Sequence, residues 1–171
     1  TTVYGSVAPE YTIIVEGFVN GEDESLIPEY SWKNISVSTE YKQGSPVGEY
    51  AFTRTGSFYN LANYEFDYTA VDAAKLTVTA KKITVTANDL TVSYGQGLTG
   101  ATFADVAEQL YGTDTFDATR VTFEAWLVDA EGNKLTKREL NSVVTAKLAE
   151  GQSYKIYPVV AALTEGTDNY T

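Results

Sequence analysis

The sequence predicts a mainly β protein built from two small modules in tandem. Hydrophobic residues make up 43% and aromatic residues 13% of the 171 residues, which is enough apolar surface for packed cores. Thr, Val and Tyr are frequent, and β-branched and aromatic side chains fit a pleated sheet better than a helix. Short runs of alternating polar and apolar residues, the pattern of half-buried strands, recur along the chain.

Two short signals occur twice and in the same order. The first is Thr-Val-Tyr-Gly at residues 2–5, which returns as Thr-Val-Ser-Tyr-Gly at residues 91–95. The second is Asn-Tyr, which occurs at residues 63–64 and again at residues 169–170. Recurrence in one order indicates internal repeats rather than a single domain.

The boundary between the repeats is predicted within residues 75–87, where two Thr/Val alternations follow one another without Gly or Pro. We interpret the first alternation as the last strand of one module and the second as the first strand of the next. The first module then covers residues 1–80, and a divergent second module covers residues 81–171. Because two adjoining strands leave few free torsions, we expect a stiff joint at residues 80–82.

Strands and turns of the first module follow from alternation and turn chemistry. Strands are predicted at residues 11–15, 30–37, 49–54 and 64–68. Turns are predicted at Asn20-Gly21 and at Gly44-Ser45-Pro46, because these residue types favour turn geometry.

The second module has fewer strand signals and one helical signal. Strands are predicted at residues 83–87, 121–128 and 153–161, with a hairpin-like turn at residues 129–133. Apolar side chains recur at i, i+3, i+4, i+7 and i+8 over residues 103–111, with Thr102 placed as a cap and Gly112 as a terminator. This spacing predicts a helix, although the equivalent stretch of the first module is strand-like. A shorter helix is also predicted at residues 136–141.

The first module carries a characteristic order of motifs. These are Tyr-Gly at residues 4–5, Gly-Phe-Val-Asn-Gly-Glu-Asp at 17–23, Ser-Pro-Val-Gly-Glu-Tyr at 45–50, Asn-Tyr at 63–64 and Leu-Thr-Val-Thr-Ala at 76–80. Their order resembles the MBG repeats of bacterial surface proteins. The second module matches the pattern at residues 83–87, 94–95 and 169–170 and departs from it in the middle.

The resemblance implies tandem modules in a long extracellular protein, secreted or attached to a bacterial cell surface. It also implies small β modules of one of two kinds, a β-grasp-like sheet with a short helix or an Ig-like β-sandwich. The chain starts without Met, and we expect it to be an excerpt of a longer protein and monomeric. The sequence contains no membrane span or signal peptide.

Composition excludes several kinds of chemistry. The chain has no His and no Cys, so a His-based triad, a Cys nucleophile, a disulfide and the usual zinc or haem ligands are all missing. The net charge of −11 disfavours nucleic acid as a partner. We therefore predict no enzymatic activity and no cofactor. Scattered Asp and Glu side chains indicate neither a glycosidase pair nor a metal site, although acidic turns at residues 22–24, 114–117 and 129–133 are possible calcium ligands.

Aromatic side chains are the remaining candidates for ligand contact. Tyr4, Tyr64, Tyr94 and Tyr170 occupy matching repeat positions, which favours a packing or hydrogen-bonding role. Tyr41, Tyr59 and Tyr111 have no such match and are predicted as exposed rings that could contact a host glycan or surface protein. Two functions remain open, an adhesin stalk or spacer and a module that binds glycan or protein directly.

Overall fold

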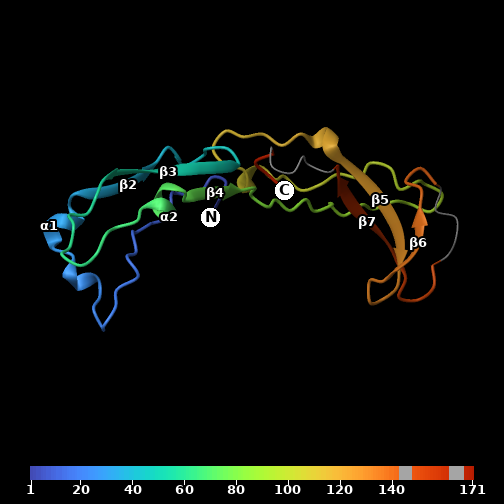
Figure 1. Ribbon diagram of the computed structural model, residues 1–171. Helices are drawn as coiled ribbons and strands as arrows, with labels where there is room; N and C mark the ends of the chain where they lie inside the picture. The colour runs from blue at the N-terminus through green and yellow to red at the C-terminus, as the bar shows by residue number, and fades with distance from the viewer. Residues whose placement is uncertain (143–147, 162–167) are drawn as a thin grey trace. The chain divides into compact units, whose positions relative to one another are not determined.

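The computed structural model describes residues 1–142, 148–161 and 168–171, and it is mainly β (Figure 1). Helix accounts for only 11% of the described residues, and the described strands form two sheets, so the predicted fold class is confirmed. The chain divides into two compact units. Unit 1 comprises Thr1–Lys81 together with Thr164–Thr171, and unit 2 comprises Lys82–Leu163.

Unit 1 contains a four-stranded mixed sheet. Its strands are β1 (Thr2–Val3), β4 (Lys75–Thr79), β3 (Gly48–Gly56) and β2 (Ile35–Thr39), in that spatial order. β1 is parallel to its neighbour β4, and the pairs β4–β3 and β3–β2 are antiparallel. The strands predicted at residues 49–54 and 75–80 are confirmed as parts of β3 and β4, because their alternation matches a sheet with one buried face.

Short helices precede and follow the β2–β3 hairpin in unit 1. They are the 3-10 helix η1 (Glu24–Leu26), α1 (Glu29–Trp32) and α2 (Thr69–Asp72). Asp23 starts η1 by accepting the N–H of Ser25 at 2.8 Å, and Pro28, with φ of −60°, leads directly into α1. The prediction of one strand over residues 30–37 is therefore wrong in its first half, and β2 starts only at Ile35.

Two predicted strands of unit 1 are not strands. Residues 11–15 and 64–68 run without a ladder partner, apart from one bridge between Leu61 and Tyr64. Their alternation has another cause, because Ile13 and Val15 pack on the core while Ile14 is 72% exposed. Burial of alternate side chains needs an extended backbone but not a neighbouring strand.

An aromatic-rich core holds unit 1 together. Its buried residues are Ile27, Ile35 and Phe58, and the half-buried side chains packed against them include Trp32, Phe66 and Tyr68. The ring centroid of Phe58 lies 4.7 Å from that of Trp32 and 4.9 Å from that of Phe66. Such contacts contribute beyond the area they bury, so most rings of this unit serve its stability.

The last described residues belong to unit 1. The N–H of Lys81 donates to the carbonyl of Asn169 at 2.9 Å, and the N–H of Thr171 donates to the carbonyl of Lys81 at 3.0 Å. The prediction placed residues 169–170 in the second module. They lie in unit 1 because the backbone just after β4 offers a free donor and acceptor there.

Unit 2 contains a three-stranded antiparallel sheet, with β5 (Val121–Val128) between β6 (Lys134–Arg138) and β7 (Ser153–Val160). The strands predicted at residues 121–128 and 153–161 are confirmed. The turn at residues 129–133 is also confirmed, because Asp129 accepts the backbone N–H of Asn133 at 2.8 Å. The helix predicted at residues 136–141 is wrong, since its first half pairs with β5 as β6.

The helix predicted at residues 103–111 is also wrong. Only a 3-10 turn, η2 (Ala107–Gln109), forms there, and a second one, η3 (Ala118–Arg120), precedes β5. Phe103 instead forms a β-bridge with Ala87. The side-chain amide of Gln109 accepts the N–H of Thr84 at 2.7 Å and donates to the carbonyl of Thr84 at 2.9 Å. Long-range pairing thus holds the start of the segment extended. The strand predicted at residues 83–87 is reduced to this single bridge.

Each unit therefore has one sheet among its described residues. An Ig-like sandwich needs two sheets packed face to face, whereas unit 1 has a sheet with short helices, as in the β-grasp-like alternative. In unit 2 the described residues contain only 3-10 turns beside the sheet. No helix of the described chain has the length and apolar character that crossing a bilayer requires.

Candidate functional site

Tyr41 is part of the core and not of an exposed surface. Its side chain is 5% exposed, its hydroxyl donates to the carbonyl of Ser6 at 2.6 Å, and its ring meets that of Tyr50 at a centroid distance of 5.5 Å. The expectation of an exposed ring at this position is wrong. The hydroxyl ties the loop after β1 to the segment between β2 and β3, which is a structural role.

Tyr59 is exposed, as predicted, and it has an aromatic neighbour that the sequence did not reveal. Tyr59 is 52% exposed and Tyr30 is 64% exposed, with ring centroids 5.5 Å apart and planes inclined by 56°. The Oγ of Ser31, which is completely buried, accepts the backbone N–H of Tyr59 at 2.8 Å and fixes the pair on α1. The two rings form a small aromatic surface on unit 1.

Tyr111 lies in unit 2, whereas Tyr41 and Tyr59 lie in unit 1. Tyr111 is half-buried, and its carbonyl accepts the backbone N–H of Asp114 at 3.1 Å. Of the four tyrosines at matching repeat positions, Tyr4 is 5% exposed and Tyr64 donates its hydroxyl to Glu22, as a packing or hydrogen-bonding role requires. Tyr94, however, is 76% exposed.

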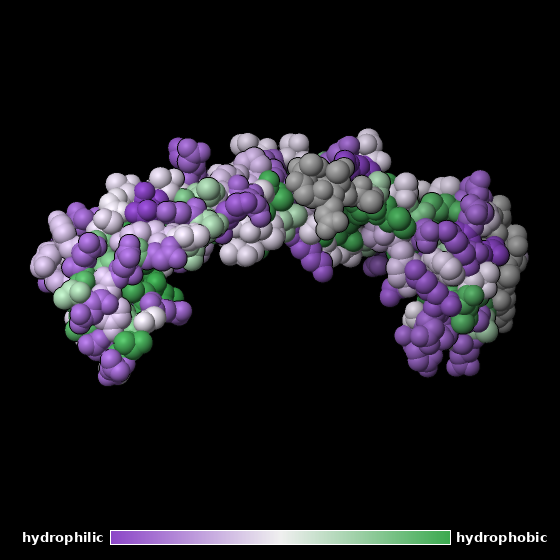
Figure 2. All heavy atoms as spheres, in the orientation of Figure 1, coloured by the Kyte–Doolittle hydropathy of each residue, from purple (hydrophilic) through white to green (hydrophobic). Residues whose placement is uncertain are grey.

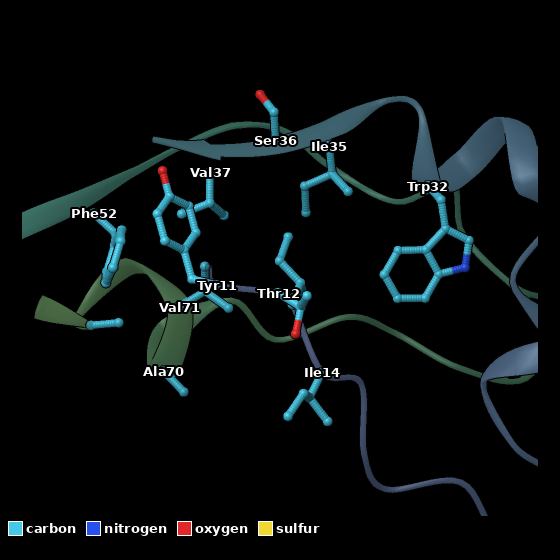
Figure 3. Close-up of a pocket in the computed structure, with 12 residues that line it drawn as sticks. Tyr11, Thr12, Ile14, Trp32, Ile35, Ser36, Val37, Phe52, Ala70 and Val71 are labelled. Atoms are coloured by element: carbon cyan, nitrogen blue, oxygen red, sulfur yellow. The ribbon is translucent and has the colours of Figure 1, made fainter. Parts of the chain in front are cut away.

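A largely apolar pocket of about 510 Å³ lies between β2, α2 and the extended segment at residues 11–14 (Figure 3). The rings of Tyr11, Trp32 and Phe52 lie around it, and the hydroxyls of Tyr11 and Thr12 are among its polar groups. The Ser36 side chain points to the other side of β2. Figure 2 shows hydrophobic side chains gathered along the loop before η1, which includes the exposed Ile14 and Val19. A pocket of this kind can accept an apolar or amphipathic group.

A wider and more acidic depression of about 850 Å³ lies beside it, lined in part by Glu22, Asp23 and Glu24. These carboxylates already have roles in the fold. The hydroxyl and N–H of Ser25 hold the pKa of Asp23 below its usual range, and the hydrogen bond to Glu22 raises the pKa of Tyr64. The acidic turn thus organises its own loop.

The other acidic turns behave in the same way. Thr119 donates its hydroxyl and N–H to Asp117, and Asn133 donates its amide and N–H to Asp129, which lowers the pKa of each carboxyl group. Within the described ranges, no three His, Cys, Asp or Glu side chains gather closely enough to hold a metal ion.

The sheet of unit 2 carries a second group of aromatic side chains that sequence reasoning missed. The Nζ of Lys134 lies 4.9 Å from the ring centroid of Trp126 and 4.1 Å from that of Tyr157. Lys137 forms an ion pair with Glu124 and thereby lowers the pKa of that carboxyl group, with a smaller contribution from the indole N–H of Trp126. The alternation Glu124-x-Trp126 along β5 is the signal that could have placed these residues on one face.

The mixed sheet of unit 1 begins with β1, in the Thr-Val-Tyr-Gly motif, and β1 is parallel to β4. β4 ends at Thr79, close to the predicted module boundary. Residues 1–81 match the family model of the MBG domain (YGX type). MBG domains are typical of extracellular or surface proteins, and the match indicates an adhesion-type module. The MBG match covers unit 1 up to Lys81, the residue at which the first continuous stretch of that unit ends. Searches of curated proteins and of solved structures gave no significant match.

Proposed function

We propose that this chain is a non-catalytic spacer segment of a secreted or cell-surface bacterial adhesin, in which an MBG module is followed by a divergent second copy. The match of residues 1–81 to the MBG domain carries the proposal. Two further features support it. Several rings of unit 1, among them Trp32, Phe58 and Phe66, pack into its core, and carboxylates of its turns cap or tie their own loops, so neither group is set aside for catalysis.

The kinship of the second copy is supported by local structure. In unit 1 the 3-10 helix capped by Asp23 comes shortly before the antiparallel β2–β3 pair. In unit 2 a 3-10 helix capped by Asp117 comes directly before β5, which pairs with the long strand β7. Asn-Tyr follows each of these strand pairs in the sequence. A common order of capped turn, strand pair and Asn-Tyr is what divergence from one module would leave.

Stiffness at the joint is supported by the hydrogen bonds of Lys81. Both of its backbone groups are used, the N–H by Asn169 and the carbonyl by Thr171, at 2.9 and 3.0 Å. The chain leaves unit 1 after Lys81 and rejoins it by Asp168, so two covalent connections link the units instead of one. A spacer needs such restriction because a flexible tether does not hold its cargo at a fixed distance.

Small-angle X-ray scattering of the 171-residue chain at low and at moderate salt tests the spacer. We expect a sharply bounded distance distribution that changes little with ionic strength, because two covalent connections join the units and exposed charges contribute little. A broad distribution that shifts with salt would mean a flexible tether and would contradict the proposal.

Direct binding of a host glycan or protein is the second candidate function. The observation that favours it is the exposed Tyr30–Tyr59 pair, because paired rings offer contact area at little cost in side-chain entropy. Binding to a glycan array should then be lost in Tyr59→Ala and kept in Tyr94→Ala, which removes a more exposed tyrosine from unit 2. Equal binding by both variants and the parent would exclude the pair as the contact.

A further inference from the structure

Positive charge is concentrated on the sheet of unit 2. The strands β5, β6 and β7 contain four basic residues, Lys134, Lys137, Arg138 and Lys155, and one acidic residue, Glu124. The whole chain has a net charge of −11, so this sheet opposes the charge of the rest of the protein. Segregation of this kind creates a local positive potential that attracts anionic ligands.

One face of the sheet combines this charge with aromatic rings. The strand β5 lies between β6 and β7 (Figure 1). Trp126 of β5 lies opposite Lys137 of β6 and Lys155 of β7, and Glu124 lies opposite Tyr157. Cross-strand partners share a face, so these side chains lie together. The opposite face carries Ala125, which is fully buried, and forms the core side of the sheet. On the lysine-bearing face, Lys137 and Lys155 are exposed, Glu124, Trp126 and Tyr157 are half-buried, and Val128 at the end of β5 is buried. The middle of this face is therefore accessible to solvent.

Among the residues that the structure describes, Lys134 and Lys155 of this face form no ion pair with a carboxylate, although the charge of Lys134 also acts on Glu124. Glu124 pairs with Lys137, at 2.5 Å between Oε1 and Nζ. In the described part of the chain, the ammonium groups of Lys134 and Lys155 instead lie over aromatic rings, at 4.1 and 5.9 Å from the centroid of Tyr157. Both lysines are exposed, while the rings of Trp126 and Tyr157 are half-buried and held in place.

We propose that this face binds an acidic saccharide, that is, a sugar bearing a carboxylate or a sulfate. The sugar ring would lie on Trp126 and Tyr157, and its anionic group would pair with the ammonium groups of Lys134 and Lys155. The aromatic rings and the lysines together favour an acidic saccharide over other ligands. Aromatic rings alone suit a neutral sugar, and lysines alone suit any anion, but adjacent rings and ammonium groups match a ring that carries its own charge. Nucleic acid fits poorly, because an extended polyanion would meet the acidic remainder of the chain.

This inference goes beyond the spacer function and specifies the ligand class of the binding alternative. It does not depend on the joint at Lys81, so the scattering experiment can fail while the face still binds, and the reverse also holds.

NMR titration of the 171-residue chain with sialyllactose, and with lactose as the neutral match, tests the proposal. The chain has two tryptophans, so the indole signal of Trp32 serves as an internal reference for that of Trp126. We expect sialyllactose to shift the Trp126 signal but not the Trp32 signal, lactose to bind at least about fivefold more weakly, and added salt to weaken the binding.

Lys134→Gln should reduce the affinity about fivefold or more, and Lys33→Gln, which removes an exposed lysine of unit 1, should leave it unchanged. Equal binding of lactose, equal binding by Lys134→Gln, or no shift at Trp126 would overturn the proposal. A Trp126 shift of the same size with a short polyglutamate peptide would overturn the saccharide class, because it would assign the face to anions in general.

Discussion

Asn169→Ala tests whether the last residues complete unit 1. The side-chain oxygen of Asn169 accepts the backbone N–H of Val47 at 3.0 Å, and this N–H is partly buried. Removing the acceptor leaves a polar group without its partner, which costs about 1–3 kcal/mol. The adjacent ring contact, between Tyr170 and Tyr4 at a centroid distance of 5.4 Å, would loosen with it. We therefore expect the segment at residues 169–171 to detach more often from the backbone of Lys81.

Hydrogen exchange followed by NMR measures this directly. A cost of about 1–3 kcal/mol corresponds to exchange that is roughly 5- to 150-fold faster at the Lys81 amide, which donates to Asn169, while amides in β5 keep their protection. Asn63→Ala is the matched control, because Asn63 belongs to the other Asn-Tyr pair and is exposed. Unchanged exchange at Lys81, or a loss of protection confined to unit 2, would refute the assignment of these residues to unit 1.

Three further predictions concern the stability of the fold. Gly56→Ala should lower the melting temperature far more than Gly21→Ala. Both glycines have a positive φ, but a Cβ at Gly56 would lie 1.9 Å from a backbone oxygen, whereas a Cβ at Gly21 would have no atom within 4 Å. Similar melting curves for the two variants would contradict this. The difference in melting temperature between the parent and Asp72→Asn should be constant near neutral pH and shrink below about pH 4. The hydrogen bonds from Arg54 lower the pKa of Asp72 in the folded protein. The stabilisation is therefore lost as the pH falls from the unfolded pKa of about 3.9 through the lower folded pKa. A gap that widens on acidification would give the wrong sign. Excess EDTA should leave the melting temperature unchanged, since the carboxylates of the acidic turns are used by their own loops, and a fall of several degrees that calcium reverses would show a structural ion.

The sequence predicts correctly those strands whose alternation of polar and apolar residues is matched by a neighbouring strand. β3 and β4 were predictable because both alternate and one face of each is buried, and β5 and β7 for the same reason. Residues 11–15 have an equally good alternation and no partner, and no local pattern reports the presence of a partner. The sequence predicts which side chains are buried better than it predicts hydrogen-bonded ladders.

The wrong helix at residues 103–111 has a related cause. Apolar spacing at i, i+3, i+4 and i+7 is compatible with a helix, but short helices are marginal without tertiary support. Here the bridge between Phe103 and Ala87 holds the start of the segment extended, and Val106, at 3% exposed, is buried without a helix around it. Tertiary pairing decided the conformation, and the sequence of the segment alone does not contain that information.

The candidate rings divided for the same reason. Neither Tyr41 nor Tyr59 has a counterpart at a matching repeat position, and only packing separates a ring at 5% exposure from one at 52%. The alternation along β5 predicts that Trp126 lies on a strand, but it does not predict which residues of β6 and β7 lie beside it. The aromatic face of unit 2 therefore could not be predicted. A cross-strand register is needed before charges and rings from three strands can be seen as one surface.

The two units use their aromatic side chains differently, and this difference makes a spacer and a binder compatible in one chain. In unit 1 the rings of Trp32, Phe58 and Phe66 are contacts within the core, so changing them costs stability before it affects any surface. In unit 2 the rings of Trp126 and Tyr157 lie on the lysine-bearing face of a sheet whose core side is already filled by residues such as Ala125. Substitutions on that face can therefore alter ligand contact at little cost to the fold. In the proposed function, unit 2 thus carries the binding role while unit 1 has a structural one.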